Sequence, residues 1–197
     1  MEDKVSLRPS FITRVNGSRM HFFAVFDGHG GPKVSALCRD HMHAIRADEL
    51  ARASAAYRKE TQQHVEAEDR AWKATLTRSF AQADELRASG VPQGTIGGST
   101  AMVALLVRGR IIVAKCGDSR AVLCRAGRAI PLSQDHSVSR PEEMACVTAA
   151  GGVVFKYGGV LRVQWMLAKT HALSTFSHVT SKQATFLNLF ATALPIY

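Results

Sequence analysis

The hydrophobic and polar positions of this chain follow a strand pattern first and then a helical pattern over two long stretches. Residues 20–26 are apolar and rich in aromatic side chains, which predicts a buried strand. Residues 33–52 begin just after a proline and carry apolar positions at helical spacing, which predicts a helix. Residues 53–66 are polar and rich in alanine, as in a helical extension or a surface insertion, and residues 68–87 show the clearest helical period. The positions expected to share one face are Val34, Leu37, His41, Ile45 and Leu50 in the first helix and Trp72, Leu76, Phe80, Ala83 and Leu86 in the second.

After residue 98 the hydrophobic period changes to that of strands, interrupted by dipeptides typical of tight turns. The turn dipeptides are Arg108-Gly109, Ala126-Gly127 and Gly158-Gly159. The predicted elements are strands at 100–107, 110–115, 120–125, 128–132, 153–157 and 160–163 and a helix at 141–150. Helices and strands occur in separate blocks and do not alternate, so the predicted fold class is α+β.

The first predicted strand ends in Asp27-Gly28-His29, which is followed by two further glycines. A carboxylate at the end of a buried strand supplies the oxygen ligands that Mg²⁺ and Mn²⁺ prefer. Gly28 lets the backbone approach a metal closely, and His29 can transfer a proton near neutral pH. The alternative is an ordinary strand and glycine-rich turn with both polar side chains solvated. The residues of this segment by themselves leave both interpretations open.

Several motifs follow one another in a fixed order along the chain. They are Met1-Glu2-Asp3, Asp27-Gly28-His29-Gly30-Gly31, Gly97-Gly98-Ser99-Thr100-Ala101, Lys115-Cys116-Gly117-Asp118-Ser119-Arg120, Leu132-Ser133-Gln134-Asp135-His136 and Arg140-Pro141-Glu142-Glu143. In this order they resemble the metal-dependent type 2C protein serine/threonine phosphatases, and the plant enzymes most closely, over roughly residues 1–163. The resemblance implies two packed antiparallel β-sheets flanked by helices, a four-layer α-β-β-α sandwich, here incomplete at the C-terminus.

The resemblance also implies a site with two divalent ions, Mg²⁺ or Mn²⁺. The implied metal ligands are Glu2, Asp3, Asp27, Gly28 through its carbonyl oxygen, and Asp118, and the implied catalytic residues are Asp27 and His29. Asp27 would bridge the two ions, and His29 would protonate the departing Ser or Thr oxygen. Asp118 would contact a weaker third ion, although an aspartate in a Gly-Asp-Ser turn is as often a local cap.

Composition and charge narrow the expected partners. The net charge is +9, but the basic residues are dispersed and no aromatic residues interleave with them, so we expect phosphorylated protein substrates and no nucleic acid. The four cysteines form no CxxC pair, which is typical of reduced thiols in the cytosol or nucleus. No apolar stretch is long enough for a membrane span, and we expect a monomer without membrane association.

The chain departs from the family pattern at both ends. The chain starts at Met1, so it lacks an arginine that the family carries a few residues earlier, and Trp165 stands where the family has a glycine. Residues 169–197 contain no family motif and neither Asp nor Glu, as expected of alternative splicing or a faulty gene model. We therefore predict a partial catalytic domain at 1–168 and a divergent tail at 169–197. With two further metal-binding aspartates missing, we expect a phosphatase of low or no activity, or alternatively a non-catalytic module that binds kinases or receptors.

Overall fold

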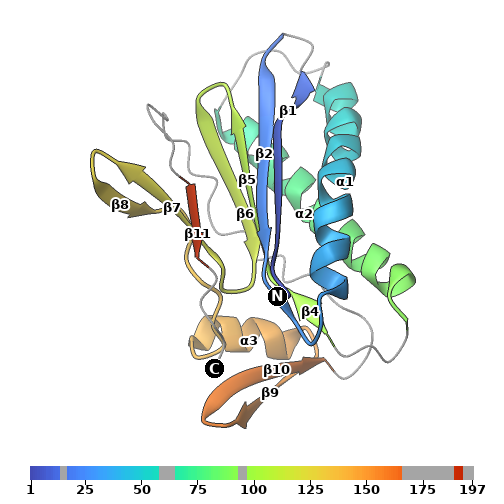
Figure 1. The fold of residues 1–197 in the computed structure, drawn as a ribbon, viewed down its shortest axis with the longest axis vertical. Coiled ribbons are helices and arrows are strands. Elements are labelled where there is room, and N and C mark those ends of the chain that lie inside the picture. The colour runs from blue at the N-terminus through green and yellow to red at the C-terminus, as the bar shows by residue number, and fades with distance from the viewer. Residues whose placement is uncertain (14–16, 58–64, 93–96, 166–188, 193–197) are drawn as a thin grey trace.

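The computed structural model describes residues 1–13, 17–57, 65–92, 97–165 and 189–192 of the chain (Figure 1). The helices are α1 (Lys33–Tyr57), α2 (Val65–Gly90) and α3 (Pro141–Ala149). The strands are β1 (Lys4–Thr13), β2 (Arg19–Phe26), β3 (Gly28–His29), β4 (Gly98–Ser99), β5 (Ala101–Val107), β6 (Arg110–Cys116), β7 (Arg120–Arg125), β8 (Arg128–Pro131), β9 (Gly152–Tyr157), β10 (Val160–Trp165) and β11 (Leu189–Thr192).

Four strands form the central antiparallel sheet, in the order β1-β2-β5-β6 (Figure 1). Strand β2 alternates along its length between buried and partly exposed side chains. Because successive side chains of a strand point to opposite faces, Phe22 and Phe26 pack on one side of the sheet, whereas Phe23 packs on the other. The strand predicted at residues 20–26 is confirmed, and it separates two hydrophobic clusters.

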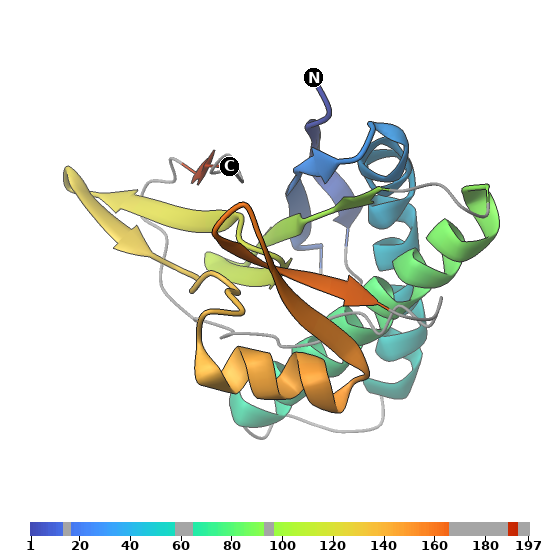
Figure 2. The same ribbon diagram turned by 90° about the horizontal axis from the view of Figure 1, so that it is seen from below.

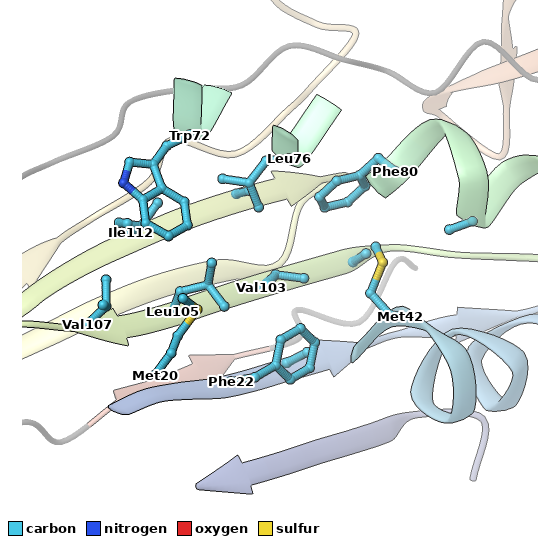
Figure 3. Packing of buried hydrophobic residues seen from close by; sticks show 14 of the residues in the cluster. Met20, Phe22, Met42, Trp72, Leu76, Phe80, Val103, Leu105, Val107 and Ile112 are labelled. Atoms are coloured by element: carbon cyan, nitrogen blue, oxygen red, sulfur yellow. The ribbon is translucent and has the colours of Figure 1, made fainter. Parts of the chain in front are cut away.

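Helices α1 and α2 cover one face of the sheet and enclose the larger cluster (Figures 1 and 3). Trp72, Leu76 and Phe80 of α2 recur at helical spacing and lie over β5 and β6, where Leu105 and Ile112 meet them. The predicted face of α2 is therefore confirmed. Burying large apolar side chains of this kind contributes about 1.5–3 kcal/mol each, which makes this interface the main support of the sheet.

The predicted face of α1 is partly wrong, because His41 is exposed and the buried side includes Arg46 and Glu49. The guanidinium of Arg46 lies 5.3 Å from the ring centroid of Trp72, and the Glu49 carboxylate pairs with Arg78 at 2.6 Å. A prediction from the spacing of apolar residues leaves charged residues out of the buried face of a helix. Here the second helix supplies partners that make their burial possible.

The opposite face of the sheet carries a smaller cluster to which β7 and β8 contribute. These two strands form a three-stranded antiparallel sheet with β11, in the order β11-β7-β8. Hairpins β5–β6 and β7–β8 turn at Arg108 and Ala126, whose φ angles are 50° and 49°, and each is followed by a glycine with positive φ. Such turns match the twist of antiparallel strands, so the predicted hairpins, including β9–β10, are confirmed.

Strand β1 was not predicted, although it is the longest strand in the described residues. Its pairing with β2 is interrupted by an irregularity between Arg8 and Ile12, and Ser10 there has a φ of 55°. Three residues of β1 lie opposite one residue of β2 at this irregularity, and most side chains of β1 are exposed, so the sequence shows no regular apolar period there. The predicted α+β class with antiparallel sheets is confirmed, with helix α3 beside β9 at the end of the molecule shown lowest in Figure 1.

Candidate metal centre

All four strands of the central sheet begin or end at one end of the sheet, which is called the sheet edge below. Lys4 pairs with Phe26 and Ala101 pairs with Cys116, so β1 and β5 begin where β2 and β6 end. In Figure 1 the N-terminus and β4 mark this edge. The backbones of Asp27 and Thr100 meet there, with the Thr100 N–H donating to the Asp27 carbonyl oxygen at 2.8 Å. The residues just outside the four ladders at this edge are Asp3, Asp27, Thr100 and Gly117.

The pKa of Asp27 shows that neighbouring carboxylates act on this residue. Burial and neighbouring carboxylates raise the pKa of Asp27 to about 6. After burial, the largest contribution comes from Asp3, which also shares a hydrogen bond with the Asp27 carboxyl group. Asp118 and Glu2 add further repulsion. The structure thus brings together four carboxylates that the sequence placed in three separate motifs.

The chemistry of this cluster fits a divalent cation. Three carboxyl groups add to the cost of ionising Asp27, and carboxylate oxygens are the ligands that Mg²⁺ and Mn²⁺ prefer. Within the ranges that the structure describes, no three His, Cys, Asp or Glu side chains converge closely enough to hold an ion by themselves. The cluster therefore supplies the charge and ligand type for a cation, spread along the sheet edge.

Gly28 allows the N-terminal segment to reach this cluster. A Cβ atom at Gly28 would lie 2.7 Å from the Glu2 carbonyl oxygen and 2.7 Å from the Ser35 hydroxyl oxygen. The single proton of the Ser35 hydroxyl group is shared between the same Glu2 carbonyl oxygen and the Pro32 carbonyl oxygen, which lies 3.1 Å from the hydroxyl oxygen. Only glycine leaves room for this contact, so Gly28 and Ser35 place the acidic pair Glu2 and Asp3 beside Asp27.

His29 is solvent-exposed at the same edge, on the short strand β3. It pairs with Gly98 of β4, and a Cβ atom at Gly98 would lie 2.6 Å from the His29 Nε2 atom. Figure 2 shows β3 and β4 side by side below the N-terminal segment. The imidazole therefore lies against the glycine backbone, close in sequence to Asp27 and open to a ligand from solvent.

Thr100 and Ser119 are site residues that the sequence analysis did not identify. The Thr100 hydroxyl accepts a hydrogen bond from the Asp27 N–H at 3.3 Å and lies 2.7 Å from the Ser119 hydroxyl. Both side chains are buried, so they connect the Asp27 strand end rigidly to the turn that carries Asp118. The only local signals were that Thr100 follows Gly97-Gly98-Ser99 and that Ser119 follows Gly117-Asp118, which do not distinguish a connecting role from a surface one.

The free energy of unfolding of the cation-free protein is expected to fall as pH rises from about 4 to about 6. The pKa values of Asp27 and of Asp84 on α2 are raised from 3.8 to about 6, mainly by burial. Between these values the folded state holds protons that the unfolded state has released, so raising the pH favours unfolding. Urea unfolding midpoints at about pH 4.5 and about pH 6.5, in a chelating buffer, measure this effect. The chain with both Asp27→Asn and Asp84→Asn is the control, because other groups with shifted pKa values, such as His43 and Asp135, act alike in both chains. An equal change of midpoint in the two chains would contradict the assignment.

Fold and site together define an α+β protein with a cluster of carboxylates at one sheet edge, and known proteins are similar to it in sequence and in fold. A sequence profile of the family "Protein phosphatase 2C" matches residues 1–191. Probable protein phosphatase 2C 75 of Arabidopsis thaliana is 43% identical over 188 residues, covering 88% of this chain and 44% of the relative. Probable protein phosphatase 2C 37 of Oryza sativa subsp. japonica is 51% identical over 160 residues, covering 72% of this chain and 34% of the relative.

Solved structures agree with this likeness. A C. elegans sex determining protein superposes with a TM-score of 0.64 at 25% identity, covering 85% of this chain and 39% of that protein. The serine-threonine phosphatase 2C of Toxoplasma gondii superposes with a TM-score of 0.63 at 22% identity, covering 80% and 52%, and this match supports the fold.

This chain belongs to the protein phosphatase 2C family, whose members are metal-dependent hydrolases, and its similar relatives include plant proteins. It spans about a third to a half of the length of the curated relatives cited above. No helix in the described residues is both long and apolar enough to cross a membrane.

Proposed function

We propose that this chain hydrolyses phosphoserine and phosphothreonine in proteins with the help of Mg²⁺ or Mn²⁺. The observation that carries the proposal is that carboxylates from three separate motifs meet at one sheet edge, where burial and then the charges of Asp3, Asp118 and Glu2 raise the pKa of Asp27. Membership of a family of protein phosphatases supports the reaction, and the oxygen-rich donor set supports the type of ion.

The residues of this edge have distinct roles in the proposed reaction. The bound cations would polarise the phosphate group and activate the attacking water. Asp27 would bridge the cations with the Gly28 carbonyl beside it. Glu2, Asp3 and Asp118 would complete the oxygen ligands, directly or through water. His29 would donate a proton to the departing Ser or Thr oxygen, a step worth about 10²–10⁴ in rate.

Hydrolysis of a phosphothreonine peptide by the purified chain tests the proposal. Release of inorganic phosphate is measured with MnCl₂, with MgCl₂ and with a chelator, and p-nitrophenyl phosphate serves as a second substrate. We expect cation-dependent turnover at a low rate, and we expect His29→Gln to slow turnover of the peptide more than that of p-nitrophenyl phosphate. Nitrophenolate is a good leaving group that needs little protonation, which is the reason for the difference. A folded chain that releases no phosphate under any of these conditions would refute the catalytic proposal.

A second candidate function is a non-catalytic module that competes with longer family members for kinases or receptors. One observation favours it: the described residues contain no three ligating side chains that close around one point. Such a module would still bind a phosphoprotein partner without releasing phosphate. Capture of a phosphorylated peptide by the chain, measured in parallel with phosphate release, separates the two functions.

Three further proposals follow from the sequence. The chain is proposed to be monomeric. It is also proposed to act in the cytosol or nucleus, because its cysteines form no disulfide framework and all four are free thiols. The proposed boundary between the catalytic part and the tail at residue 168 lies outside the described residues. Light scattering of the purified chain and the position of a tagged chain in cells would test the first two proposals.

A further inference from the structure

A buried lysine lies directly behind the proposed metal centre. Lys115 on β6 follows Ile111 and Val113 on the face of the sheet opposite to α1 and α2, and only 2% of its surface is exposed. Its ammonium group donates to the Ser119 carbonyl at 3.4 Å and lies 3.8 Å from the Asp135 carboxylate. An ammonium is rarely buried without carboxylate partners, so the carboxylates that act on this one need to be identified.

The charges of three carboxylates act on this buried ammonium, and two of the three have an arginine of their own. Asp135 binds Arg120 through two hydrogen bonds of 3.0 and 2.5 Å, and Glu143 lies 3.7 Å from Arg140. The third carboxylate is Asp118, which forms no ion pair within the part of the chain that the structure describes. The field of Asp118 nevertheless acts on the ammonium, where it opposes the lowering of the lysine pKa by burial. The lysine is thus the internal positive charge whose field reaches Asp118.

The backbone around Asp118 holds this arrangement in place. Ser119, the next residue, is buried and its hydroxyl lies 2.7 Å from that of Thr100. On the other side, the His136 N–H donates to the Gly117 carbonyl at 3.1 Å, and the Gly117 N–H donates to His136 Nδ1 at 3.3 Å. These contacts fix the backbone on both sides of Asp118, next to the Ser119 carbonyl to which the ammonium donates.

We propose that Lys115 is a built-in cation that weakens the binding of a divalent ion at Asp118 and so sets the affinity of the weaker ion of the metal centre. A fixed positive charge close to a carboxylate repels an incoming cation and offsets part of the carboxylate's charge. The inference rests on the proposed cation site and deepens it, because it assigns the difference between stronger and weaker ions to a residue outside the ligand set. Lys115 is a positioning charge and touches neither substrate nor ion.

Three substitutions at residue 115 separate charge from packing. Lys115→Met removes the charge and keeps a long apolar side chain, and replacing a buried charge by a hydrophobic residue of similar size is often neutral for stability. The arginine that holds Asp135 remains in this variant, so Asp135 keeps an ion-pair partner. Lys115→Arg keeps the charge and is the matched control. Lys115→Gln removes the charge with a polar side chain and replaces the methionine variant if that variant fails to fold.

Calorimetric titration of the purified full chain with MnCl₂ at constant ionic strength tests the inference. We expect a stronger and a weaker binding event, with the weaker one tightened about three- to tenfold by Lys115→Met and unchanged by Lys115→Arg. The gain in affinity should disappear when Asp118→Asn is combined with Lys115→Met, because this double-mutant cycle isolates the interaction between residues 115 and 118. A merely structural lysine would lower affinity when replaced.

Three results would overturn the inference, and one of them would also overturn the proposed function. An unchanged or weakened second event in a folded Lys115→Met or Lys115→Gln chain, with normal circular dichroism, would overturn the inference while leaving the proposed function intact. The complete absence of Mn²⁺ binding by the unsubstituted chain would overturn both. Retention of the gain in the Asp118→Asn background would show that the lysine acts on a different group, which also overturns the inference.

Discussion

Replacing Asp27 by asparagine is expected to stabilise the cation-free protein and to abolish its stabilisation by Mn²⁺. Asp27 is repelled by Asp3, Asp118 and Glu2, and this repulsion together with burial raises its pKa to about 6. An uncharged amide relieves the repulsion at neutral pH, so the cation-free melting temperature should rise. Without its central carboxylate the cluster should no longer hold a divalent ion. Differential scanning fluorimetry with a chelator and with increasing MnCl₂ measures both effects.

The expected size follows from mass action. A ligand at a concentration of about 100 times its Kd stabilises the folded state by about 2.7 kcal/mol, which corresponds to roughly 5–10 °C for a chain of this length. Asp27→Asn should show no such rise. Asp84→Asn is the matched control, since burial also raises the pKa of Asp84 to about 6, against the opposing charge of Arg87. We expect the Asp84→Asn chain to keep the full Mn²⁺ response. An equal Mn²⁺ response in Asp27→Asn would place the cation elsewhere.

Replacing Gly117 by alanine is expected to cost about 3 kcal/mol of stability and to disturb the connection between Asp27 and Asp118. Gly117 has a φ of +104°, a conformation that side chains rarely adopt. A Cβ atom there would also lie 2.7 Å from both Cβ and Cγ2 of Thr100. Backbone strain and overpacking each contribute about 1–3 kcal/mol. Urea unfolding gives the change in free energy, and the Mn²⁺ response of the variant reports on the site.

Gly127 provides the control for this prediction. Its φ of +73° is also positive, but a Cβ atom at this position would meet no atom within 4 Å. Gly127→Ala should therefore show only the backbone strain, about 1–2 kcal/mol, and leave the Mn²⁺ response unchanged. If both alanine variants lose the same stability, the close approach of Gly117 to Thr100 contributes nothing and the prediction is wrong.

Much of the candidate site could be predicted from the sequence because its chemistry resides in short motifs. The segment from Asp27 to His29 shows a buried strand, a carboxylate and a flexible loop within a few residues, and the structure places Glu2, Asp3 and Asp118 close enough to act on Asp27. Their individual roles as ligands remain predictions. Thr100, Ser119 and Ser35 were missed because a hydroxyl group binds backbone or solvent equally well, and only its neighbours in space decide between the two.

Buried charged residues also could not be predicted from the sequence. Lys115 and Arg46 stand in segments whose apolar neighbours define the strand and the helix, yet both are almost completely buried. Hydrophobic period assigns such residues to the surface, because burial of a charge is costly without partners. The partners Asp135 and Trp72 come from other elements, and their positions cannot be derived from local spacing.

By itself the sequence determined the type and approximate bounds of most elements, the hairpin turns, and the carboxylates and imidazole available for chemistry. These properties depend on local periodicity and on the conformational preferences of single residues. Only the tertiary structure decided that β1 pairs with β2, that the acidic N-terminus reaches Asp27, and that Lys115 lies behind Asp118. The physical reason is that pairing of distant strands sets their register, and the register determines which charges meet at the sheet edge and how strongly they act on one another.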